Sequence, residues 1–381
     1  MIARHLAALL RRSKKSVLLL GPRQTGKSTL VHALQPDLTI NLAHEPTYLQ
    51  FARNPAELEE RFAAGVFRTV FIDEIQRLPS LLNTIQALVD AGRPPTKYYL
   101  TGSSARKLKR GGANLLPGRL HTYHLGPLVA SELAYQMNAS RALEAGTLPG
   151  IWTEADAWER RKTLQTYAAT YLKEEIQAEA LTRNIEGFSR FLFVVAAEAG
   201  KLLDLSKLAS AASIPRQSAL RFFEILEDTL VVRRCEAFRN SERRRLVQHP
   251  RFFFFDTGVL NGLLNNFTAS ADRLGGLFEH LVFNQLMDSA AARDEPLRLS
   301  SYRTEHGAEV DFILEWGRET LAVEVKASTT VTRLDTRGFR SFADYYGRRH
   351  RPVLVYLGTT QKVVDGVEVL PWQTLLETLH L

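Results

Sequence analysis

The chain has a single cysteine, Cys235, among its 381 residues. A disulfide within the chain is therefore excluded, and this usage fits a reducing compartment, so we expect a cytoplasmic protein. No apolar run approaches the roughly 20 residues that a membrane-spanning helix needs, and we expect no membrane partner. Repeats and low-complexity segments are also missing from the sequence, and the composition is that of a globular protein rather than a disordered one.

The overall charge is basic, with a net charge of +8 and an isoelectric point near 9.6. Such a surplus favours anionic partners such as nucleic acid, although a soluble protein with a basic surface has the same composition. A chain of 381 residues is too long for one hydrophobic core. We expect three domains, over residues 1–135, 136–249 and 250–381.

Short apolar runs alternate with helical patterns in the first of these segments. We predict helices at 27–34, 55–64 and 79–90, and strands at 16–20, 37–42, 68–72 and 97–101. Alternation of strands and helices is typical of an α/β fold with a parallel sheet.

The segment from Gly21 to Ser28 fits the P-loop pattern G-x-x-x-x-G-K-[ST], between an apolar strand and a helix. Its glycines let backbone N–H groups point at phosphate oxygens, and Lys27 is expected to reach the β- and γ-phosphates. The Ser28 hydroxyl is expected to bind Mg²⁺. We therefore expect ATP and Mg²⁺ as cofactors, with these residues at the nucleotide: Gly21, Pro22, Arg23, Gln24, Thr25, Gly26, Lys27, Ser28, Thr29 and Ser103.

Two carboxylates follow the third predicted strand. Asp73 ends an apolar run that we expect to lie beside the P-loop strand, where its carboxylate can hold Mg²⁺. Glu74 comes next and can orient or deprotonate the attacking water. An Asp-Glu pair after an apolar run is otherwise a common helix cap, but a P-loop upstream favours the catalytic interpretation.

Further polar residues lie after the fourth strand. Thr101 and Ser103 are candidates for a hydrogen bond to the γ-phosphate or the water, although a simple Gly-Ser turn has the same sequence. Arg119, in a Pro-Gly-Arg turn, is a candidate arginine finger, acting within its own subunit or on a neighbour. A surface arginine in a turn remains the alternative.

These motifs resemble an AAA+-type P-loop ATPase over residues 1–135. One prokaryotic family pairs such an ATPase with a C-terminal domain of unknown function, and the resemblance rests on five segments: Leu100 to Ser104, Gly118-Arg119, Gly126-Pro127-Leu128, Glu132, and Phe252 to Gly258. The resemblance implies an ATP-driven machine and a homo-oligomer that can be a hexameric ring.

Residues 136–249 read as mostly helical, with a helix-turn-helix over 204–228 followed by a strand at 230–238. That order is typical of a winged helix. Arg216, Gln217 and Arg221 would lie early in the second helix, where such motifs read a DNA groove. A basic run, consisting of Arg239, Arg243, Arg244 and Arg245, follows where a wing is expected and could contact phosphates. A solvated loop on a structural helical domain is the alternative.

A hairpin in residues 250–381 brings two carboxylates together. A turn at Gly317-Arg318 joins strands 308–316 and 320–327, and its register places Asp311 opposite Glu324. Cross-strand neighbours have Cβ atoms about 4.5–5.5 Å apart. Two carboxylates that close repel each other, and a divalent cation between them would remove that cost.

The set Glu279, Asp311, Glu324 and Lys326 resembles the PD-(D/E)xK nuclease superfamily. That resemblance implies a helix Glu, a strand Asp and a Glu-x-Lys strand, with Glu279, Asp311 and Glu324 as Mg²⁺ ligands. Asp311, Glu324 and Lys326 would then act in phosphodiester hydrolysis, as a Mg²⁺-dependent deoxyribonuclease. A nuclease-like fold that only binds DNA, and a half-exposed sheet face with solvated charges, remain open.

The sequence as a whole predicts an ATP-hydrolysing AAA+ motor that moves or remodels DNA, with a nuclease-like domain that binds or cuts it. The main rival is an ATP-switched regulatory or assembly protein whose C-terminal domain binds protein. A third hypothesis is an ATPase whose C-terminal domain holds DNA without cutting.

Overall fold

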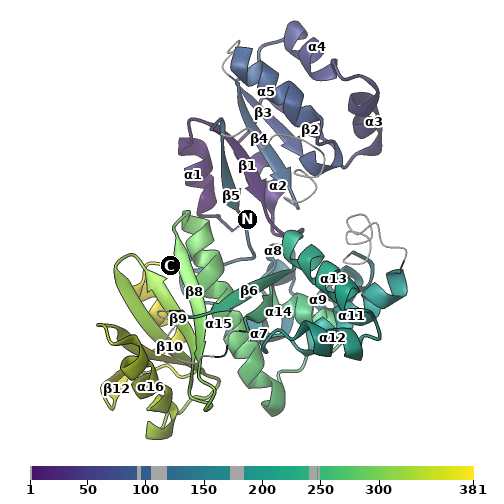
Figure 1. The fold of residues 1–381 in the computed structure, drawn as a ribbon. Helices are drawn as coiled ribbons and strands as arrows, with labels where there is room; N and C mark the ends of the chain where they lie inside the picture. The colour runs from purple at the N-terminus through teal and green to yellow at the C-terminus, as the bar shows by residue number, and fades with distance from the viewer. Residues whose placement is uncertain (1, 92–95, 104–117, 172–183, 240–246, 248) are drawn as a thin grey trace. The chain divides into compact units, whose positions relative to one another are not determined.

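The computed structural model describes residues 2–91, 96–103, 118–171, 184–239, 247 and 249–381. The chain divides into two compact units (Figure 1). Unit 1 comprises residues 1–126 with the short segments 228–230 and 291–294, and unit 2 comprises the remainder. Within the described ranges, no helix is both long enough and apolar enough to cross a membrane.

Unit 1 is built on a parallel sheet of five strands in the order β2-β3-β4-β1-β5. Its elements in chain order are α1 (Leu6–Arg12), β1 (Ser16–Leu20), α2 (Lys27–His32), β2 (Leu38–Asn41), α3 (Glu45–Arg53), α4 (Glu57–Ala64), β3 (Thr69–Asp73), the 3-10 turn η1 (Ile75–Arg77), α5 (Leu81–Ala91), β4 (Lys97–Gly102) and β5 (Leu120–His124).

Helices cover both faces of this sheet. Leu6 and Leu10 of α1 and Leu30 of α2 pack on the face that carries Val17 and Leu19. The opposite face, with Leu18 and Leu20, packs against residues of α3, α4 and α5. Because β1 is buried on both faces, its sequence is a continuous apolar run rather than an alternating one. The predicted α/β fold with a parallel sheet is confirmed for this unit.

One prediction about strand neighbours is wrong. Strand β3, which ends at Asp73, does not lie beside the P-loop strand β1, because β4 lies between them and pairs with both. The position of Thr101 is set by this order: it pairs with Leu19 of β1 and follows Leu100, which pairs with Ile72 of β3. Its side chain therefore lies between the P-loop and Asp73. Helix α3 was not predicted.

Unit 2 contains an eight-stranded mixed sheet in the order β12-β13-β11-β10-β9-β8-β6-β7. Its elements are η2 (Ala130–Leu133), α7 (Ala139–Ala145), α8 (Pro149–Thr153), α9 (Ala157–Thr166), the π-helical turn η3 (Tyr167–Tyr171), α11 (Ile185–Ala197), α12 (Leu205–Ala211), α13 (Arg216–Asp228), β6 (Val232–Ala237), β7 (Arg251–Phe254), α14 (Thr257–Leu264), α15 (Ala271–Arg293), β8 (Leu297–Arg303), β9 (Glu309–Trp316), β10 (Glu319–Lys326), η4 (Arg333–Thr336), α16 (Arg337–Tyr346), β11 (Arg351–Tyr356), β12 (Lys362–Val364), β13 (Val367–Pro371) and α17 (Trp372–Thr378).

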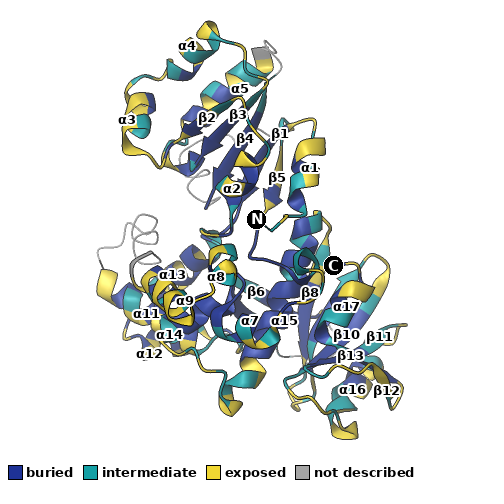
Figure 2. Cartoon of the chain, turned by 180° about the vertical axis from the view of Figure 1, so that it is seen from behind, coloured by how far each residue is buried: buried dark blue, intermediate teal, exposed yellow. Residues whose placement is uncertain are grey.

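The two faces of the larger sheet belong to different hydrophobic clusters. Leu321 and Val323 of β10 pack with α15, α17 and the helices of residues 139–264. Ala322, between them, packs on the other face with Phe339 and Phe342 of α16. Figure 2 shows β1, β3 and β4 of the first sheet and β10 and β11 of the second as mostly buried, whereas β12 is exposed. Glu324 and Lys326 lie two and four residues after Ala322 on β10. Because side chains alternate along a strand, they project toward the same face as Ala322, which is the α16 face.

The predicted hairpin is confirmed as far as Val323. Glu319 pairs with Trp316, and the register continues to Val323, which pairs with Phe312. The predicted pairing of Asp311 with Glu324 lies beyond the end of this register. Alternation does not hold at the start of β9, where Val310 and Phe312 pack in different clusters and the pairing with β8 shifts by one residue between Val310 and Ile313.

The helix-turn-helix elements lie where the sequence predicts them, with α12, α13 and then β6 in order. Strand β6 pairs antiparallel with β7 and parallel with β8, so it belongs to the large sheet. Residues from 130 to 381 contribute to one hydrophobic cluster. The boundaries predicted at 249 and 250 therefore fall inside a compact unit, and the winged-helix assignment stays a prediction.

Candidate functional site

The P-loop of unit 1 has the backbone geometry that its glycines permit. Gly26 has φ +88° and Gln24 has φ +60°, both in the left-handed region. An added Cβ at Gly21 would lie 2.2 Å from the carbonyl oxygen of Leu125, so only glycine fits there. Among the other predicted loop residues, Pro22 is buried, Arg23 is half-buried and Thr29 is exposed on α2.

The Lys27 ammonium lies against this loop. Its Nζ donates to the carbonyl oxygens of Gly21 and Pro22, each at 2.8 Å, and the side chain is buried. The Thr25 hydroxyl donates to the Pro22 carbonyl at 2.8 Å and stiffens the same turn. The ammonium is thus held at the helix N-terminus where phosphate oxygens would bind.

Ser28 and Asp73 converge at the carboxyl ends of the strands. The Ser28 hydroxyl donates to both carboxylate oxygens of Asp73, at 2.9 and 2.8 Å. The Thr101 hydroxyl also donates to Asp73. A hydroxyl and a carboxylate this close form an oxygen donor set that fits Mg²⁺, which prefers hard oxygen ligands.

Glu74 follows in a strained conformation. Its φ of +58° is rare for a residue with a side chain, and such strain is concentrated at functional sites. Its backbone N–H donates to the Thr101 hydroxyl at 3.2 Å, and the Gln76 amide donates to its carboxylate. The same Gln76 amide donates to the Ser103 hydroxyl at 3.0 Å. Thr101 and Ser103 therefore both contact the Asp73-Glu74 segment, Thr101 directly and Ser103 through Gln76.

Arg4 was missed by the sequence analysis. Its guanidinium donates to the carbonyl oxygens of Thr25 at 2.7 Å and of Gly126 at 2.8 Å. It therefore ties the P-loop to the segment after β5. Because both acceptors are backbone groups far away in sequence, no local pattern marks Arg4 as part of this site.

The position of Arg119 excludes a role on the nucleotide of its own subunit. Arg119 precedes β5, and β5 runs parallel to β1 from Leu120 beside Ser16 to His124 beside Leu20. Arg119 thus lies at the amino-terminal edge of the sheet, about 17 Å along the strands from the P-loop. There it forms an ion pair with Asp90. Ser104, at the end of the Leu100–Ser104 segment, and Pro117, in the turn before Arg119, lie outside the described residues.

The C-terminal carboxylates lie in unit 2. The Asp311 carboxylate accepts a hydrogen bond from the backbone N–H of Val325 at 2.8 Å, which places it beside the Glu324–Lys326 segment. Lys326 forms an ion pair with Glu324 at 2.8 Å. Glu279, on α15, lies on the other side of Asp311. The structure thus brings the four predicted residues together in two groups that share Asp311.

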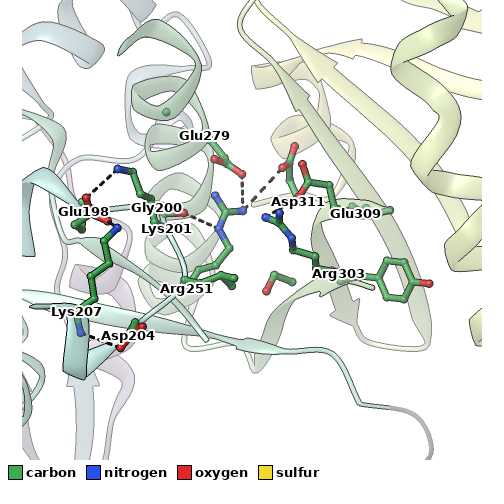
Figure 3. Close-up of a pocket in the computed structure, with 16 residues that line it drawn as sticks. Glu198, Gly200, Lys201, Asp204, Lys207, Arg251, Glu279, Arg303, Glu309 and Asp311 are labelled. Atoms are coloured by element: carbon green, nitrogen blue, oxygen red, sulfur yellow. Dashed lines mark hydrogen bonds and ion pairs between the residues drawn. The ribbon is translucent and has the colours of Figure 1, made fainter. Parts of the chain in front are cut away.

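Arg251 joins this set, and the sequence analysis did not include it. Its Nη1 lies 2.5 Å from Glu279 and 3.9 Å from Asp311 (Figure 3). Its Nε donates to the Gly200 carbonyl at 2.7 Å, and the guanidinium lies 5.2 Å from the Phe253 ring centroid. The side chain is only 15% exposed, so this arginine is fixed inside the carboxylate cluster.

The electrostatics of the cluster follow from this pairing. Although burial acts to raise it, the pKa of Glu279 lies below its ordinary value because the Arg251 guanidinium stabilises the carboxylate. Burial and the neighbouring charges of Glu279 and Glu324 hold the pKa of Asp311 well above its ordinary value. Burial also raises the pKa of Glu324, against the effect of Lys326. Two cations, Arg251 and Lys326, thus lie against three carboxyl groups.

This arrangement bears on the predicted metal site of Glu279, Asp311 and Glu324, which stays a prediction. Among the described residues, no three or more His, Cys, Asp or Glu side chains are grouped so that they could hold a metal ion. The Arg251 guanidinium supplies positive charge of the kind that a divalent cation would bring to these carboxylates. The alternative of solvated charges on a half-exposed face also stays a prediction: Glu324 is buried, whereas the Lys326 side chain is 34% exposed.

A cavity of about 610 Å³ opens beside Arg251 (Figure 3). Its other cations are also paired: Lys201 and Lys207 lie 3.1 and 2.9 Å from Glu198, and Arg303 lies 3.2 Å from Glu309. The cavity wall thus carries five carboxyl groups and four cations, and each of the four cations lies against a carboxylate.

The segment Phe252 to Gly258 has a structural role. Asp256 accepts backbone N–H groups of Val259 at 3.0 Å and Thr147 at 2.7 Å, which caps α14 and fixes the loop after α7. An added Cβ at Gly258 would lie 2.1 Å from the Ala145 carbonyl oxygen. The four phenylalanines are fully buried. The segment is thus a packing motif.

The predicted DNA-reading residues of α13 are on its surface. Arg216, Gln217 and Arg221 are exposed, together with the apolar Leu220. Arg239 is exposed as well. Arg243, Arg244 and Arg245 lie outside the described residues.

Comparison with known families divides the chain into three parts. Residues 13–134 match a family model described as an AAA domain. Residues 137–270 and 274–375 match two models described as domains of unknown function. Uncharacterized proteins of Mycobacterium bovis and Mycobacterium tuberculosis are each 28% identical to this chain over 337 residues, which cover 86% of it and 74% of each relative.

Two solved structures show only weak similarity. A Thermotoga maritima RuvB variant has a TM-score of 0.29 and 16% identity. The match covers 61% of this chain and 86% of the RuvB chain. A replication initiator DnaA bound to AMPPCP and single-stranded DNA has a TM-score of 0.27 and 11% identity. The match covers 58% of this chain and 85% of the DnaA chain. The family match and the P-loop geometry agree that residues 13–134 are an AAA-type P-loop ATPase domain.

Proposed function

We propose that the protein hydrolyses ATP in unit 1 and uses the energy to act on DNA. Lys27 binds the β- and γ-phosphates, and Ser28 with Asp73 holds Mg²⁺. The bound metal would neutralise the charge that develops on the phosphate oxygens. Glu74 orients the attacking water and accepts its proton. Thr101 fixes both Asp73 and the Glu74 backbone, and Ser103 acts through Gln76.

The observation that carries the ATPase proposal is the convergence of Ser28, Asp73 and Thr101. The Ser28 hydroxyl reaches Asp73 at 2.8 Å across β4, a strand that supplies Thr101 as the bridge. A residue from the first turn of α2 and two residues from the ends of β3 and β4 meet at one point. This is the carboxyl edge of a parallel sheet, where ligands bind in open α/β folds.

The DNA proposal is supported by α13. Arg216, Gln217 and Arg221 form one exposed stripe on the second helix of a helix-turn-helix, and the net charge of +8 favours an anionic partner. The first turn of α12 is capped by Asp204, which accepts the N–H groups of Ser206 and Lys207 and fixes the first helix.

We propose that the C-terminal unit holds DNA without cutting it. Arg251 and Lys326 already neutralise the carboxylates, so no divalent cation is needed to offset their repulsion. Metal-dependent cleavage would require Arg251 to leave a cluster in which it also bonds Gly200. The rival function, an ATP-switched regulatory or assembly protein that binds protein, has no comparable feature in its favour.

For Arg119, a role toward a neighbouring copy is the proposal that remains, within a homo-oligomer. Its guanidinium is 38% exposed in the ion pair with Asp90, so a neighbour can reach it.

The test is steady-state ATP turnover of the full chain with and without single-stranded, duplex and branched DNA. We expect Mg²⁺-dependent turnover that at least one DNA form raises several-fold, and no turnover in Lys27→Ala. Turnover that no DNA form changes, with no DNA binding by anisotropy, would favour the protein-binding regulator instead.

A further inference from the structure

A second basic region surrounds α16, far along the sequence from the helix-turn-helix. Residues 331–351 contain six arginines and two aspartates and no lysine or glutamate. This surplus of four positive charges is half of the net charge of the chain, within 21 of its 381 residues. So strong a local surplus indicates either a solvated face or an anion-binding surface.

The arginines of this segment differ from most cations of unit 2. Arg251, Arg233 and Arg234 each form an ion pair at 2.7 Å or closer. By contrast, Arg337, Arg340, Arg348 and Arg349 are exposed, and none of them forms a side-chain hydrogen bond or ion pair with any other described residue. Four guanidiniums in one segment are therefore available to an external anion.

Two of these arginines line a pocket of about 700 Å³. Arg337 and Arg340 lie one turn apart on α16, so their side chains leave the same face of the helix. His350 and the turn at Asp365-Gly366 form other parts of the wall. Asp365 is the one carboxylate among the described lining residues, and it lies 3.5 Å from Arg333, which compensates it.

Packing holds α16 and the His350 ring, two parts of the pocket wall, in place. Phe339 and Phe342 bury α16 against the sheet, and an added Cβ at Gly338 would lie 2.0 Å from the Glu309 carbonyl oxygen, so the helix touches β9 directly. The His350 ring packs edge-on against Phe342 at 5.1 Å and Tyr346 at 5.8 Å. A preorganised site loses less conformational entropy when a ligand binds.

We propose that this pocket, with the adjacent Arg348 and Arg349, binds the phosphodiester backbone of DNA. Guanidinium groups match phosphate oxygens with two parallel hydrogen bonds, which favours phosphate over other anions. Several arginines spread along a helix and the following loop suit a row of phosphates better than a single one. The inference rests on the proposed action on DNA and gives the C-terminal unit a means of holding it.

The pocket also lies beside the carboxylate cluster. Pro352, which lines it, pairs with Ala322 of β10, two residues before Glu324. Glu324 and Lys326 project toward the same face as α16. A DNA backbone bound by Arg337 and Arg340 would therefore run near the site that, by analogy of residues, a nuclease would use for cutting.

The experiment is fluorescence anisotropy of a labelled DNA duplex with the full chain over a range of salt concentrations. The variant is Arg337→Glu/Arg340→Glu. The matched control is Lys162→Glu/Arg318→Glu, two exposed cations of the same unit with the same change in charge. The slope of log K against log salt is negative for DNA binding. We expect the variant to make it less steep by about 1.8, at roughly 0.9 per lost phosphate contact. The affinity of the variant for DNA should be at least tenfold lower than that of the control.

Two further variants separate the possible failures. Arg216→Glu/Arg221→Glu tests the helix-turn-helix contact, and Arg337→Gln/Arg340→Gln repeats the test should the glutamates prevent folding. If wild type binds DNA and the α13 variant weakens binding, but both α16 variants match the control, the inference is overturned and the proposed function stands. If wild type binds no DNA at all, both fail.

Discussion

The guanidinium of Arg251 lies 2.5 Å from the carboxylate of Glu279, inside a cluster where the sequence predicts a metal ion. Arg251→Met should leave Glu279 and Asp311 buried without their cation. Removing one partner of a buried ion pair costs about 3–5 kcal/mol. We expect the free energy of unfolding, measured by urea denaturation, to fall by about that amount.

The double variant Arg251→Met/Glu279→Gln is the control for this prediction. It removes both charges, so much of the lost stability should return. If Arg251→Met alone unfolds at the wild-type urea concentration, Arg251 does not neutralise the cluster.

The same cluster predicts the response to metal. Mn²⁺ should leave the melting temperature of the nucleotide-free Asp73→Asn chain unchanged, because a cation that does not bind the folded state cannot stabilise it. Asp73→Asn, which disables the ligand set of unit 1, is the background for this measurement. A rise in melting temperature that persists in Asp73→Asn and disappears in Asp311→Asn would show that the carboxylates do bind metal.

Thr101→Val tests how the catalytic carboxylates are held in unit 1. The exchange keeps the shape of the buried side chain but removes the hydroxyl that donates to Asp73 and accepts the Glu74 N–H. Leaving a buried group without its hydrogen bond costs about 1–3 kcal/mol. We expect kcat to fall about tenfold or more, with a higher Mg²⁺ requirement, in a chain that melts within a few degrees of wild type.

Ser103→Ala is the comparison for Thr101→Val. Ser103 is linked to Glu74 through Gln76, so its loss should have a smaller effect on kcat. A larger effect for Ser103→Ala than for Thr101→Val would reverse the roles given to the two hydroxyls.

The parts of the site that the sequence predicts are those carried by short segments. The P-loop and the Asp73-Glu74 pair each lie within a few residues of a strand end, so local pattern suffices. The hairpin register is equally local, because the two-residue turn at Gly317-Arg318 fixes it through Val323.

The parts that the sequence does not predict depend on distant contacts. The order of parallel strands is set by packing across the whole sheet, so the position of β4 between β1 and β3 has no local signal. Arg251 meets Glu279 and Asp311 only after β7, α15 and β9 assemble. The one signal was an arginine directly before four consecutive phenylalanines, where a buried charge needs a partner.

Gly146→Ala tests the packing role of the Asp256 segment. Gly146 has φ +73°, and an added Cβ would lie 2.0 Å from a carboxylate oxygen of Asp256. The left-handed backbone and the displaced cap should together lower the free energy of unfolding by about 3 kcal/mol or more. Calorimetric melting of the full chain provides the measurement.

Gly347→Ala is the matched control, since Gly347 has φ +64° but open space where the Cβ would be. It should cost only the backbone strain, about 1 kcal/mol. Equal losses in the two variants would mean that the contact with Asp256 contributes nothing.

The most direct test of the whole account is single-turnover ATP hydrolysis by wild type, Glu74→Gln and Lys27→Ala with Mg²⁺ present. Glu74→Gln should bind ATP as wild type does but hydrolyse it about 10²–10⁴-fold more slowly, because an amide cannot accept the proton of the water. Lys27→Ala should no longer bind ATP, since it removes the positive charge that contacts the phosphates. Hydrolysis by Glu74→Gln at the wild-type rate would contradict the site described for unit 1.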